Sequence, residues 1–115
     1  MKKIEAIIRP EKLEELVEQL EAAGYDGMTV TEVSGHGRQK GIVEQFRGKE
    51  YKLKFIPKVK LEMVVKNNGS GTVEKIVQVI CSVAYTGAVG DGKIFISTID
   101  DVVRVRTKER GEIAI

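Results

Sequence analysis

The sequence contains few of the residues that form covalent crosslinks or bind transition metals. Among 115 residues there is one cysteine, Cys81, and one histidine, His36. An intramolecular disulfide needs two cysteines, and a structural zinc site normally takes its four ligands from Cys and His. Both are therefore excluded within one chain. Cys81 falls on the apolar face of a predicted helix, where we expect a small core residue rather than a nucleophile.

Aromatic residues, long apolar runs and a strong net charge are also missing. Aromatics make up 5% of the sequence, the net charge is +2, and no apolar run approaches the ~18–20 residues that cross a membrane. Glu5 and Arg9 interrupt the apolar residues at the N-terminus, which is unlike a secretory signal. Together with the lone cysteine, this pattern predicts a cytoplasmic protein.

The remaining composition is typical of one globular domain. Hydrophobic residues make up 42% and charged residues 31% of the chain, and we treat residues 1–115 as a single domain. The basic residues are concentrated, because residues 36–60 hold eight Lys or Arg and only two acidic residues. This local excess predicts an anion site or a docking segment, whereas a whole-domain nucleic-acid binder would be more basic throughout.

Hydrophobic periodicity predicts strands and helices in an alternating order. Period-two alternation and β-branched residues predict strands over 2–9, 28–33, 57–65, 94–99 and 102–106. Helical spacing predicts helices over 11–23, after Pro10, and over 73–84, with Thr72 as N-cap. The order β-α-β, long loop, β-α-β predicts an α+β fold of the ferredoxin-like type, a four-stranded antiparallel sheet with two helices on one face.

A glycine-rich loop over residues 86–93 follows the second predicted helix. It contains the pattern Gly87-x-x-Gly90-Asp91-Gly92-Lys93. Glycines allow backbone N–H groups to approach phosphate oxygens, and a lysine neutralises those oxygens. The GKS or GKT ending of a Walker loop and its following helix are missing. The pattern predicts phosphate binding, with a plain tight turn as the alternative.

Arg104 and Arg106 lie two residues apart in the last predicted strand. This spacing puts both side chains on one face, where two guanidinium groups can bind a polyphosphate through bidentate hydrogen bonds. A solvated edge strand is the alternative. Because the arginine pair and the glycine-rich loop both adjoin the strand predicted at 94–99, together they favour a nucleotide.

The connection over residues 34–56 carries four glycines and most of the basic excess. A connection of this length in a small domain is normally functional or disordered. Within it, residues 35–41 combine glycines with cations, which suits either an anion site or a solvated loop tip. His36 has no visible acidic partner and is expected to be a surface histidine. Tyr51 is expected to be a contact residue or, if exposed, a modifiable one.

Glu62 is the acidic residue of its predicted strand and shares a face with Lys58 and Lys60. We expect it to form a cross-strand ion pair or to have a hydrogen-bonding role. The sequence offers no recognisable arrangement of nucleophile, base and acid, so enzymatic catalysis is not expected.

Several motifs resemble one known family. Residues 86–96 (TGAVGDGKIFI) closely resemble the C-terminal signature of the PII signal-transduction family, the nitrogen regulatory P-II proteins, and residues 46–51 (FRGKEY) resemble its T-loop motif. Shorter matches in the same register occur at residues 27–30, 37–41, 57–59 and 104–107. The resemblance covers nearly the whole chain and identifies residues 36–56 as a T-loop.

The resemblance implies a homotrimer that binds ATP or ADP in the clefts between its subunits. With Mg²⁺ and ATP bound, such proteins bind 2-oxoglutarate, and this moves the T-loop. The T-loop then engages or releases ammonium transporters, nitrogen-assimilation enzymes or regulators. The resemblance thus implies a regulator of nitrogen, carbon and energy metabolism that is not an enzyme, binds no nucleic acid and meets a membrane only through a transporter partner.

The same resemblance assigns roles residue by residue. The phosphate and ribose side of the nucleotide is assigned to Gly37, Arg38, Gly87, Gly90, Asp91, Gly92, Lys93, Arg104 and Arg106. The adenine contacts are Thr29, Glu62 and Val64. The 2-oxoglutarate site comprises Gln39, which is also the Mg²⁺ ligand, Lys58 as the cation, and the backbone of Lys40 and Gly41. Tyr51 stands at the position that is uridylylated in some members.

The sequence also departs from the family pattern. Phe46 and Lys49 replace the usual tyrosine and small residue of the T-loop motif, so the serine phosphorylation of some members is impossible at Lys49. Ala88 replaces the usual basic residue of the glycine-rich loop, and the turn over residues 67–71 is longer than usual. We expect that longer turn to be a tolerated surface feature.

Two other functional classes share the predicted element order. RNA-recognition domains stack bases on aromatic residues of their central strands, and no predicted strand here carries paired aromatics. A phosphoryl-transfer enzyme that used His36 would need a base or an orienting partner, and the sequence supplies neither.

Overall fold

The fold is built on one four-stranded sheet, and the computed structural model describes residues 1–36, 43–46, 49–52, 55–67 and 69–115. The strands are β1 (Lys2–Ile8), β2 (Thr29–Gly35), β5 (Ile56–Val65) and β6 (Lys93–Thr98), in the order β2-β5-β1-β6. Every neighbouring pair in this sheet is antiparallel. The helices α1 (Leu13–Ala22) and α2 (Thr72–Ala84) connect β1 to β2 and β5 to β6.

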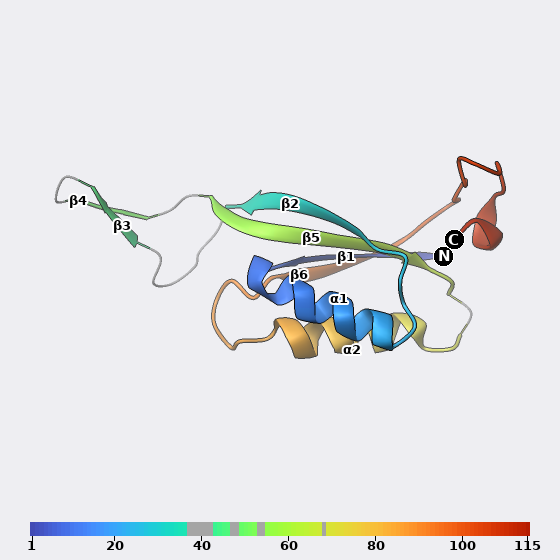
Figure 1. Cartoon of the computed structure of the whole chain (residues 1–115), viewed down its shortest axis with the longest axis horizontal. Helices are drawn as coiled ribbons and strands as arrows, with labels where there is room; N and C mark the ends of the chain where they lie inside the picture. The colour runs from blue at the N-terminus through green and yellow to red at the C-terminus, as the bar shows by residue number, and fades with distance from the viewer. Residues whose placement is uncertain (37–42, 47–48, 53–54, 68) are drawn as a thin grey trace.

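The remaining elements are short. A 3-10 turn, η1 (Pro10–Lys12), leads into α1, and a second one, η2 (Gly111–Ala114), lies near the C-terminus. Strands β3 (Val43–Phe46) and β4 (Lys49–Lys52) pair as an antiparallel hairpin within the predicted T-loop. Figure 1 shows this hairpin beyond one end of the sheet and the C-terminal segment at the other end.

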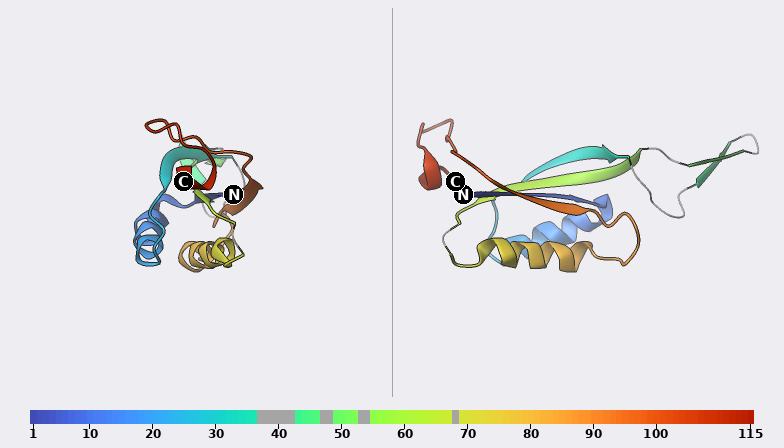
Figure 2. Two further views of the ribbon diagram at one scale, coloured as in Figure 1. Left: turned by 90° about the vertical axis from the view of Figure 1, so that its right-hand side faces the viewer. Right: turned by 180° about the vertical axis from the view of Figure 1, so that it is seen from behind.

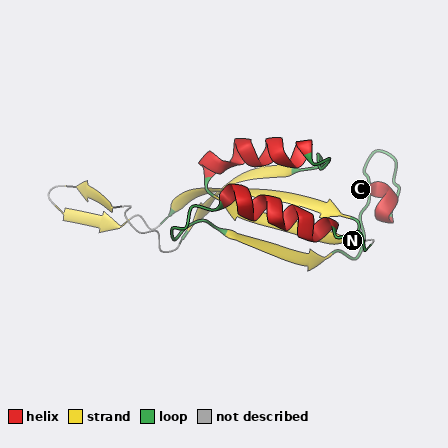
Figure 3. Ribbon diagram, turned by 90° about the horizontal axis from the view of Figure 1, so that it is seen from below, coloured by secondary structure: helices red, strands yellow, loops and turns green. Residues whose placement is uncertain are grey.

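Both helices cover the same face of the sheet (Figure 1; Figure 2). Figure 3 shows α1 and α2 next to each other on that face, and the two helices are in contact. In the part of the chain that the structure describes, the opposite face of the sheet carries no α-helix. The predicted ferredoxin-like fold is therefore confirmed, with element boundaries that differ by one or two residues.

The core lies between the sheet and the two helices. Its largest fully buried side chains are Ile4, Ile8, Leu16, Leu20, Leu61, Ile76 and Ile80. Those on strands lie on one side of the pleat, and those on each helix are one turn apart, as the two periodicities require. Burial of each such side chain contributes about 1.5–3 kcal/mol.

Strand β5 shows the predicted alternation from Val59 to Val65. Val59, Leu61 and Met63 are buried on the helix side, whereas Lys60 and Glu62 on the other side are half-buried. Lys58 belongs to the outer face but is only 9% exposed. A buried lysine has to satisfy its ammonium group within the protein, so Lys58 marks a position where other groups close over the outer face.

The strand predicted over residues 102–106 is wrong. Val103 forms an isolated bridge with Arg110, and the chain turns after Arg104, whose carbonyl accepts a hydrogen bond from Lys108 N at 2.8 Å. Lys108 has a φ of 62°, which allows the chain to reverse there. Alternating valines and arginines form a sheet strand only where a neighbouring strand accepts their backbone hydrogen bonds. Residues 102–106 instead bond to residues 108–111 of the same segment.

The expectation that Cys81 is a core residue is also wrong, because its side chain is exposed. The buried side of α2 is formed by Ile76, Ile80, Val83 and Ala84. Cys81 follows Ile80 directly, so it is rotated about 100° away from the centre of that stripe. A helix that packs on one side only has a narrow buried stripe, and Cys81 falls outside it.

Candidate functional site

The predicted site residues that the structure describes gather in two separate cavities. One lies where β5 and β6 begin and β1 and β2 end, and we call it the loop cavity because the glycine-rich loop closes it. The other lies at the far end of the same strands, and we call it the terminal cavity because C-terminal residues line it. Lys58 of the first and Glu62 of the second are roughly 13 Å apart along β5.

The loop cavity brings together four residues that the sequence predicts to bind an anion, namely Lys58, Gly90, Gly92 and Lys93. It has a volume of about 420 Å³ and is lined by Ile7, Gly35, His36, Ile56, Lys58, Val89, Gly90, Gly92, Lys93 and Phe95. The sheet register places Ile7 between Lys60 of β5 and Lys93 of β6. The central strand β1 therefore brings the start of β5 and the end of the glycine-rich loop to one place.

Lys58 holds the glycine-rich loop from the sheet side. Its Nζ donates a hydrogen bond to the carbonyl oxygen of Gly90 at 2.6 Å. Burial, followed by the positive charge of Arg9, lowers the pKa of Lys58 from its ordinary value. An ammonium group kept in such a position gains from any additional anion nearby.

The glycine-rich loop has a backbone that depends on its glycines. Gly87, Gly90 and Gly92 have φ values of 88°, 104° and 110°, a region that side chains with a Cβ rarely adopt. Gly92 also lies against β1, where an added Cβ would be 1.8 Å from the carbonyl oxygen of Ile7. Gly92 is therefore needed for close packing of the loop on the sheet.

Asp91 is bonded within the loop itself. Its Oδ2 accepts hydrogen bonds from the backbone N–H groups of Thr86 at 2.8 Å and Gly87 at 3.0 Å, and its Oδ1 accepts one from the Thr86 hydroxyl. Arg9 lies 3.4 Å from Oδ1 and donates to the carbonyl of Val89 at 3.0 Å. These hydrogen bonds, led by that of the Thr86 side chain, hold the pKa of Asp91 well below its ordinary value.

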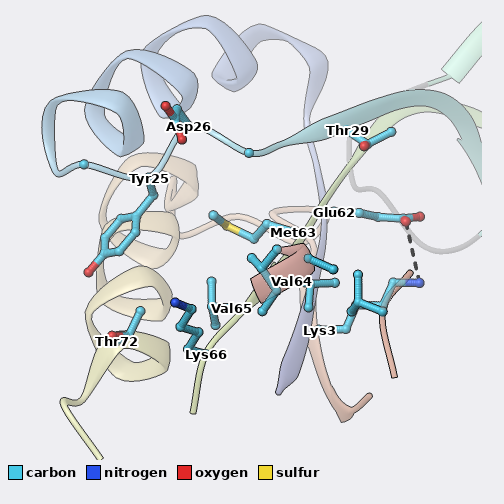
Figure 4. Close-up of a pocket in the computed structure, with 15 residues that line it drawn as sticks. Lys3, Tyr25, Asp26, Thr29, Glu62, Met63, Val64, Val65, Lys66 and Thr72 are labelled. Atoms are coloured by element: carbon cyan, nitrogen blue, oxygen red, sulfur yellow. Dashed lines mark ion pairs between the residues drawn. The ribbon is translucent and has the colours of Figure 1, made fainter. Parts of the chain in front are cut away.

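The terminal cavity contains all three residues predicted to contact adenine, Thr29, Glu62 and Val64 (Figure 4). It has a volume of about 690 Å³, and its remaining wall includes Tyr25, Asp26, Lys66, Thr72, Val102 and Ile115. Thr29 and Glu62 are direct cross-strand partners. A wall of this kind, with apolar patches and a few polar groups, suits a flat heteroaromatic ring.

The carboxylate of Glu62 is engaged in ion pairs. Lys3 Nζ lies 3.5 Å from it (Figure 4) and Lys60 Nζ 2.8 Å from it, and Lys3 also lies 2.8 Å from Glu5. The predicted cross-strand ion pair of Glu62 is thus present, with Lys3 as the partner. The Lys60 hydrogen bond is the main cause that lowers the pKa of Glu62, and the hydrogen bond to Glu5 is the main cause that raises that of Lys3.

We predict that Lys3→Met lowers thermal stability near pH 7. Glu5 and Glu62 are directly opposite each other in the register, so removing the lysine that bridges them leaves two facing carboxylates. The midpoint of thermal unfolding should fall by a few degrees at pH 7. The difference from the wild type should shrink as the pH falls and the carboxylates become protonated. An exposed lysine on α2, Lys75, provides the control, and equal effects of Lys75→Met and Lys3→Met would contradict the prediction.

The two predicted arginines do not meet the glycine-rich loop within one chain. Arg104 donates to Glu109 at 3.0 Å and to the carbonyl of Ile113 at 3.0 Å, which folds the C-terminal segment back on itself. Arg106 is exposed in the turn that follows. The segment lies at the end of the sheet opposite the T-loop hairpin (Figure 1), and its Val102 lines the terminal cavity. Within one chain, the arginine pair therefore lies at the same end of the sheet as the terminal cavity.

Some predicted residues lie outside the described part of the chain. These are Gly37, Arg38, Gln39, Lys40 and Gly41. For Tyr51 the structure describes the backbone, which belongs to β4 and faces Glu44 of β3 in the register. Their predicted roles stay predictions.

Sequence reasoning missed Arg9 as a site residue. It precedes η1, and its guanidinium reaches across to the glycine-rich loop 80 residues further along the chain. A basic residue at the end of a strand is a weak signal, because only the fold brings it near the loop. The prediction for His36 is confirmed: it is exposed and its ring packs against Phe55 with centroids 5.5 Å apart.

The described residues hold neither a set of His, Cys, Asp and Glu side chains suited to a metal ion nor a helix long and apolar enough to cross a membrane. In the four-stranded sheet, Phe95 is the single aromatic residue. The paired aromatics of an RNA-recognition surface are therefore missing from the sheet.

Comparison with known proteins places the chain among close relatives. A family model described as "Nitrogen regulatory protein P-II" matches residues 1–109. "Nitrogen regulatory protein P-II 2" of Methanothermobacter thermautotrophicus is 56% identical over 115 residues, which cover 100% of this chain and 97% of the relative. "Nitrogen regulatory protein P-II" of Mesorhizobium japonicum and that of Synechocystis sp. are each 54% identical over 115 residues and are matched over their whole length.

Proposed function

Because this chain belongs to the nitrogen regulatory protein P-II family, we propose that it is a homotrimeric sensor of energy, carbon and nitrogen status. It binds ATP or ADP and, with Mg²⁺ and ATP, 2-oxoglutarate. Its T-loop then regulates target proteins such as ammonium transporters or nitrogen-assimilation enzymes in the cytoplasm. The relatives are named as regulatory proteins, and this supports a role in regulation rather than catalysis.

The observation that carries the proposal is the loop cavity. Lys58 and Lys93 line one cavity together with Gly90 and Gly92 of a loop that is fixed to the sheet. Two cations beside a glycine-rich backbone form an arrangement that suits phosphate oxygens.

The separation of the two cavities supports binding between copies of the chain. The adenine-side residues and Arg104 lie at one end of the sheet, whereas the glycine-rich loop lies at the other. A nucleotide that uses both sets would lie between the terminal cavity of one subunit and the loop cavity of the next. Phe95, which is 50% exposed on the face of the sheet opposite the helices, is available for burial in such an interface.

Mg²⁺ and 2-oxoglutarate fit the residue types present. An amide oxygen such as that of Gln39 is a ligand type that Mg²⁺ accepts. Lys58 offers a buried cation to a carboxylate. Gln39 would supply a metal ligand, Lys58 would hold the dicarboxylate, and the cation would offset the negative charges of effector and nucleotide.

The T-loop would carry the output of the sensor. Its β3–β4 hairpin places Tyr51 in a strand, and Tyr51 is the candidate for uridylylation. Phe46 and Lys49 differ from the usual motif, so this loop would select its own partners and modifying enzyme.

Calorimetric titration of the purified protein tests the proposal. We expect ATP with Mg²⁺ to bind, and 2-oxoglutarate to bind only in the presence of both. Lys93→Ala and Arg104→Ala should each weaken ATP binding by roughly tenfold or more, because each removes a charge-assisted contact to phosphate. Lys75→Ala on α2 is the control and should leave the affinity unchanged. Unchanged affinity in both site variants would overturn the site, and a wild-type protein that binds no ATP would overturn the function.

A further inference from the structure

The carboxylate of Asp91 closes the glycine-rich loop into a ring. Its two oxygens accept hydrogen bonds from the N–H groups of Thr86 and Gly87 and from the Thr86 hydroxyl. The Thr86 hydroxyl in turn accepts a hydrogen bond from the N–H of Ala88 at 3.2 Å. Thr86 and Asp91 therefore tie the beginning of the loop to its end, five residues later.

Two cations fix the carbonyl groups in the middle of the loop. Arg9, which also contacts Asp91, donates to the carbonyl of Val89 at 3.0 Å, and Lys58 donates to that of Gly90 at 2.6 Å. Carbonyl and N–H of a trans peptide point in opposite directions. Fixing these two carbonyl groups therefore also fixes the directions of the N–H groups of Gly90 and Asp91.

The same contacts make Asp91 unsuitable as a direct ligand of a nucleotide. Both of its oxygens already accept hydrogen bonds from the loop and from Arg9. A carboxylate next to a phosphate would also repel it. Its low pKa fits this role, since the charged form is the one that the loop donors bind.

We propose that Asp91 is a positioning residue that shapes the glycine-rich loop for phosphate and does not itself touch the nucleotide. This inference rests on the proposed function, and it differs from the contact role that the family resemblance assigns to Asp91. Asp91 acts through its contacts with Thr86, Gly87 and Arg9, which fix the loop backbone. The loop backbone then binds the phosphates.

The decisive variant is Asp91→Asn, which keeps the size of the side chain but removes its charge and replaces one acceptor with a donor. Asp100→Asn is the matched control, because Asp100 is exposed and lies beyond the other end of β6. We expect Asp91→Asn to weaken ATP and ADP binding by roughly tenfold or more. Adenosine, measured by competition or direct titration, should bind the variant and the wild type equally.

Adenosine separates the possible roles of Asp91. A contact between Asp91 and the ribose would weaken adenosine binding as much as ATP binding, and this result would overturn the proposal. A general loss of folding would weaken both and lower the unfolding temperature strongly, and circular dichroism would reveal it. Equal ATP affinity of Asp91→Asn and the wild type would also overturn the proposal, while leaving the proposed function intact.

Amide resonances provide a readout that does not depend on a nucleotide. In the ligand-free protein, Asp91→Asn should shift the Thr86 and Gly87 amide signals and leave those of the central strand β1 in place. Thr86→Val should produce similar shifts and a similar loss of ATP binding. Thr86→Ser keeps the hydroxyl, so its amide signals and its ATP affinity should stay close to those of the wild type. If the wild type binds no ATP, the proposed function fails, and these amide shifts alone decide whether Asp91 shapes the loop. Unshifted Thr86 and Gly87 signals would overturn the inference.

Discussion

Replacing Gly92 with alanine is expected to displace the glycine-rich loop from the sheet and to abolish detectable ATP binding. The added Cβ would lie 1.8 Å from the carbonyl oxygen and 2.9 Å from the carbonyl carbon of Ile7. Both are backbone atoms of β1, so no side-chain rotation can relieve the clash. The φ of 110° at Gly92 adds conformational strain for any residue with a Cβ.

The expected loss of stability is large for a single methyl group. A clash with the central strand together with an unfavourable φ should lower the unfolding midpoint by roughly 10 °C. Gly69→Ala is the matched control, because Gly69 has a φ of 76° but an added Cβ there would meet nothing within 4 Å. Calorimetry with ATP and thermal unfolding measure both effects. If Gly92→Ala and Gly69→Ala change the unfolding midpoint and the ATP affinity equally, backbone strain alone explains the effect, and the close packing of Gly92 on Ile7 does not contribute.

The fold could be predicted from the sequence because each element carries a local pattern. The apolar stripes of α1 and α2 and the alternation on β5 are short-range features, and they led to the correct element order. The errors arose where the local pattern does not decide the outcome. Val103 and Val105 show the alternation of a strand, but this segment does not join the four-stranded sheet. Val103 pairs instead with Arg110 in an isolated bridge. Cys81 directly follows Ile80 in α2, but its side chain is rotated out of the buried stripe.

The candidate site could be predicted only in part, because its contacts join distant parts of the chain. The glycine-rich loop was visible as a motif, and the family resemblance that it carried is confirmed. The hydrogen bond from Lys58 to Gly90 spans 32 residues, and the contacts of Arg9 span about 80. Sequence spacing contains no signal for such pairs. They depend on β1 lying between β5 and β6, which only the sheet topology supplies.

The hydrogen bond from Lys58 to Gly90 changes the expected effect of replacing Lys58. From the family resemblance alone, Lys58 serves 2-oxoglutarate, and its loss should leave ATP binding intact. The structure adds a second role, because Lys58 also holds the carbonyl of Gly90 in the loop proposed to meet the phosphates. A single side chain would thus connect the effector site with the nucleotide site.

Lys58→Met is therefore expected to abolish 2-oxoglutarate binding and also to weaken ATP binding, by roughly tenfold. Methionine fills the buried space of the lysine stem but cannot donate a hydrogen bond to the Gly90 carbonyl. Calorimetry with ATP, followed by 2-oxoglutarate at saturating ATP, measures the two losses separately. Lys75→Met, on the exposed side of α2, should change neither affinity. Full retention of ATP affinity in Lys58→Met would contradict the second role.

The pH dependence of the same pair of proteins tests the buried charge. Burial and the charge of Arg9 lower the pKa of Lys58 in the folded protein. Below that lowered pKa the buried amine is charged, and keeping it charged destabilises the folded state relative to the unfolded state. As the pH rises through the lowered pKa toward the ordinary lysine pKa, the wild type should gain stability relative to Lys58→Met. Binding of 2-oxoglutarate by the wild type should weaken over the same range, because the cation that it needs is lost. Opposite pH trends for stability and effector binding follow only if one buried ammonium group serves both, and parallel trends would refute this.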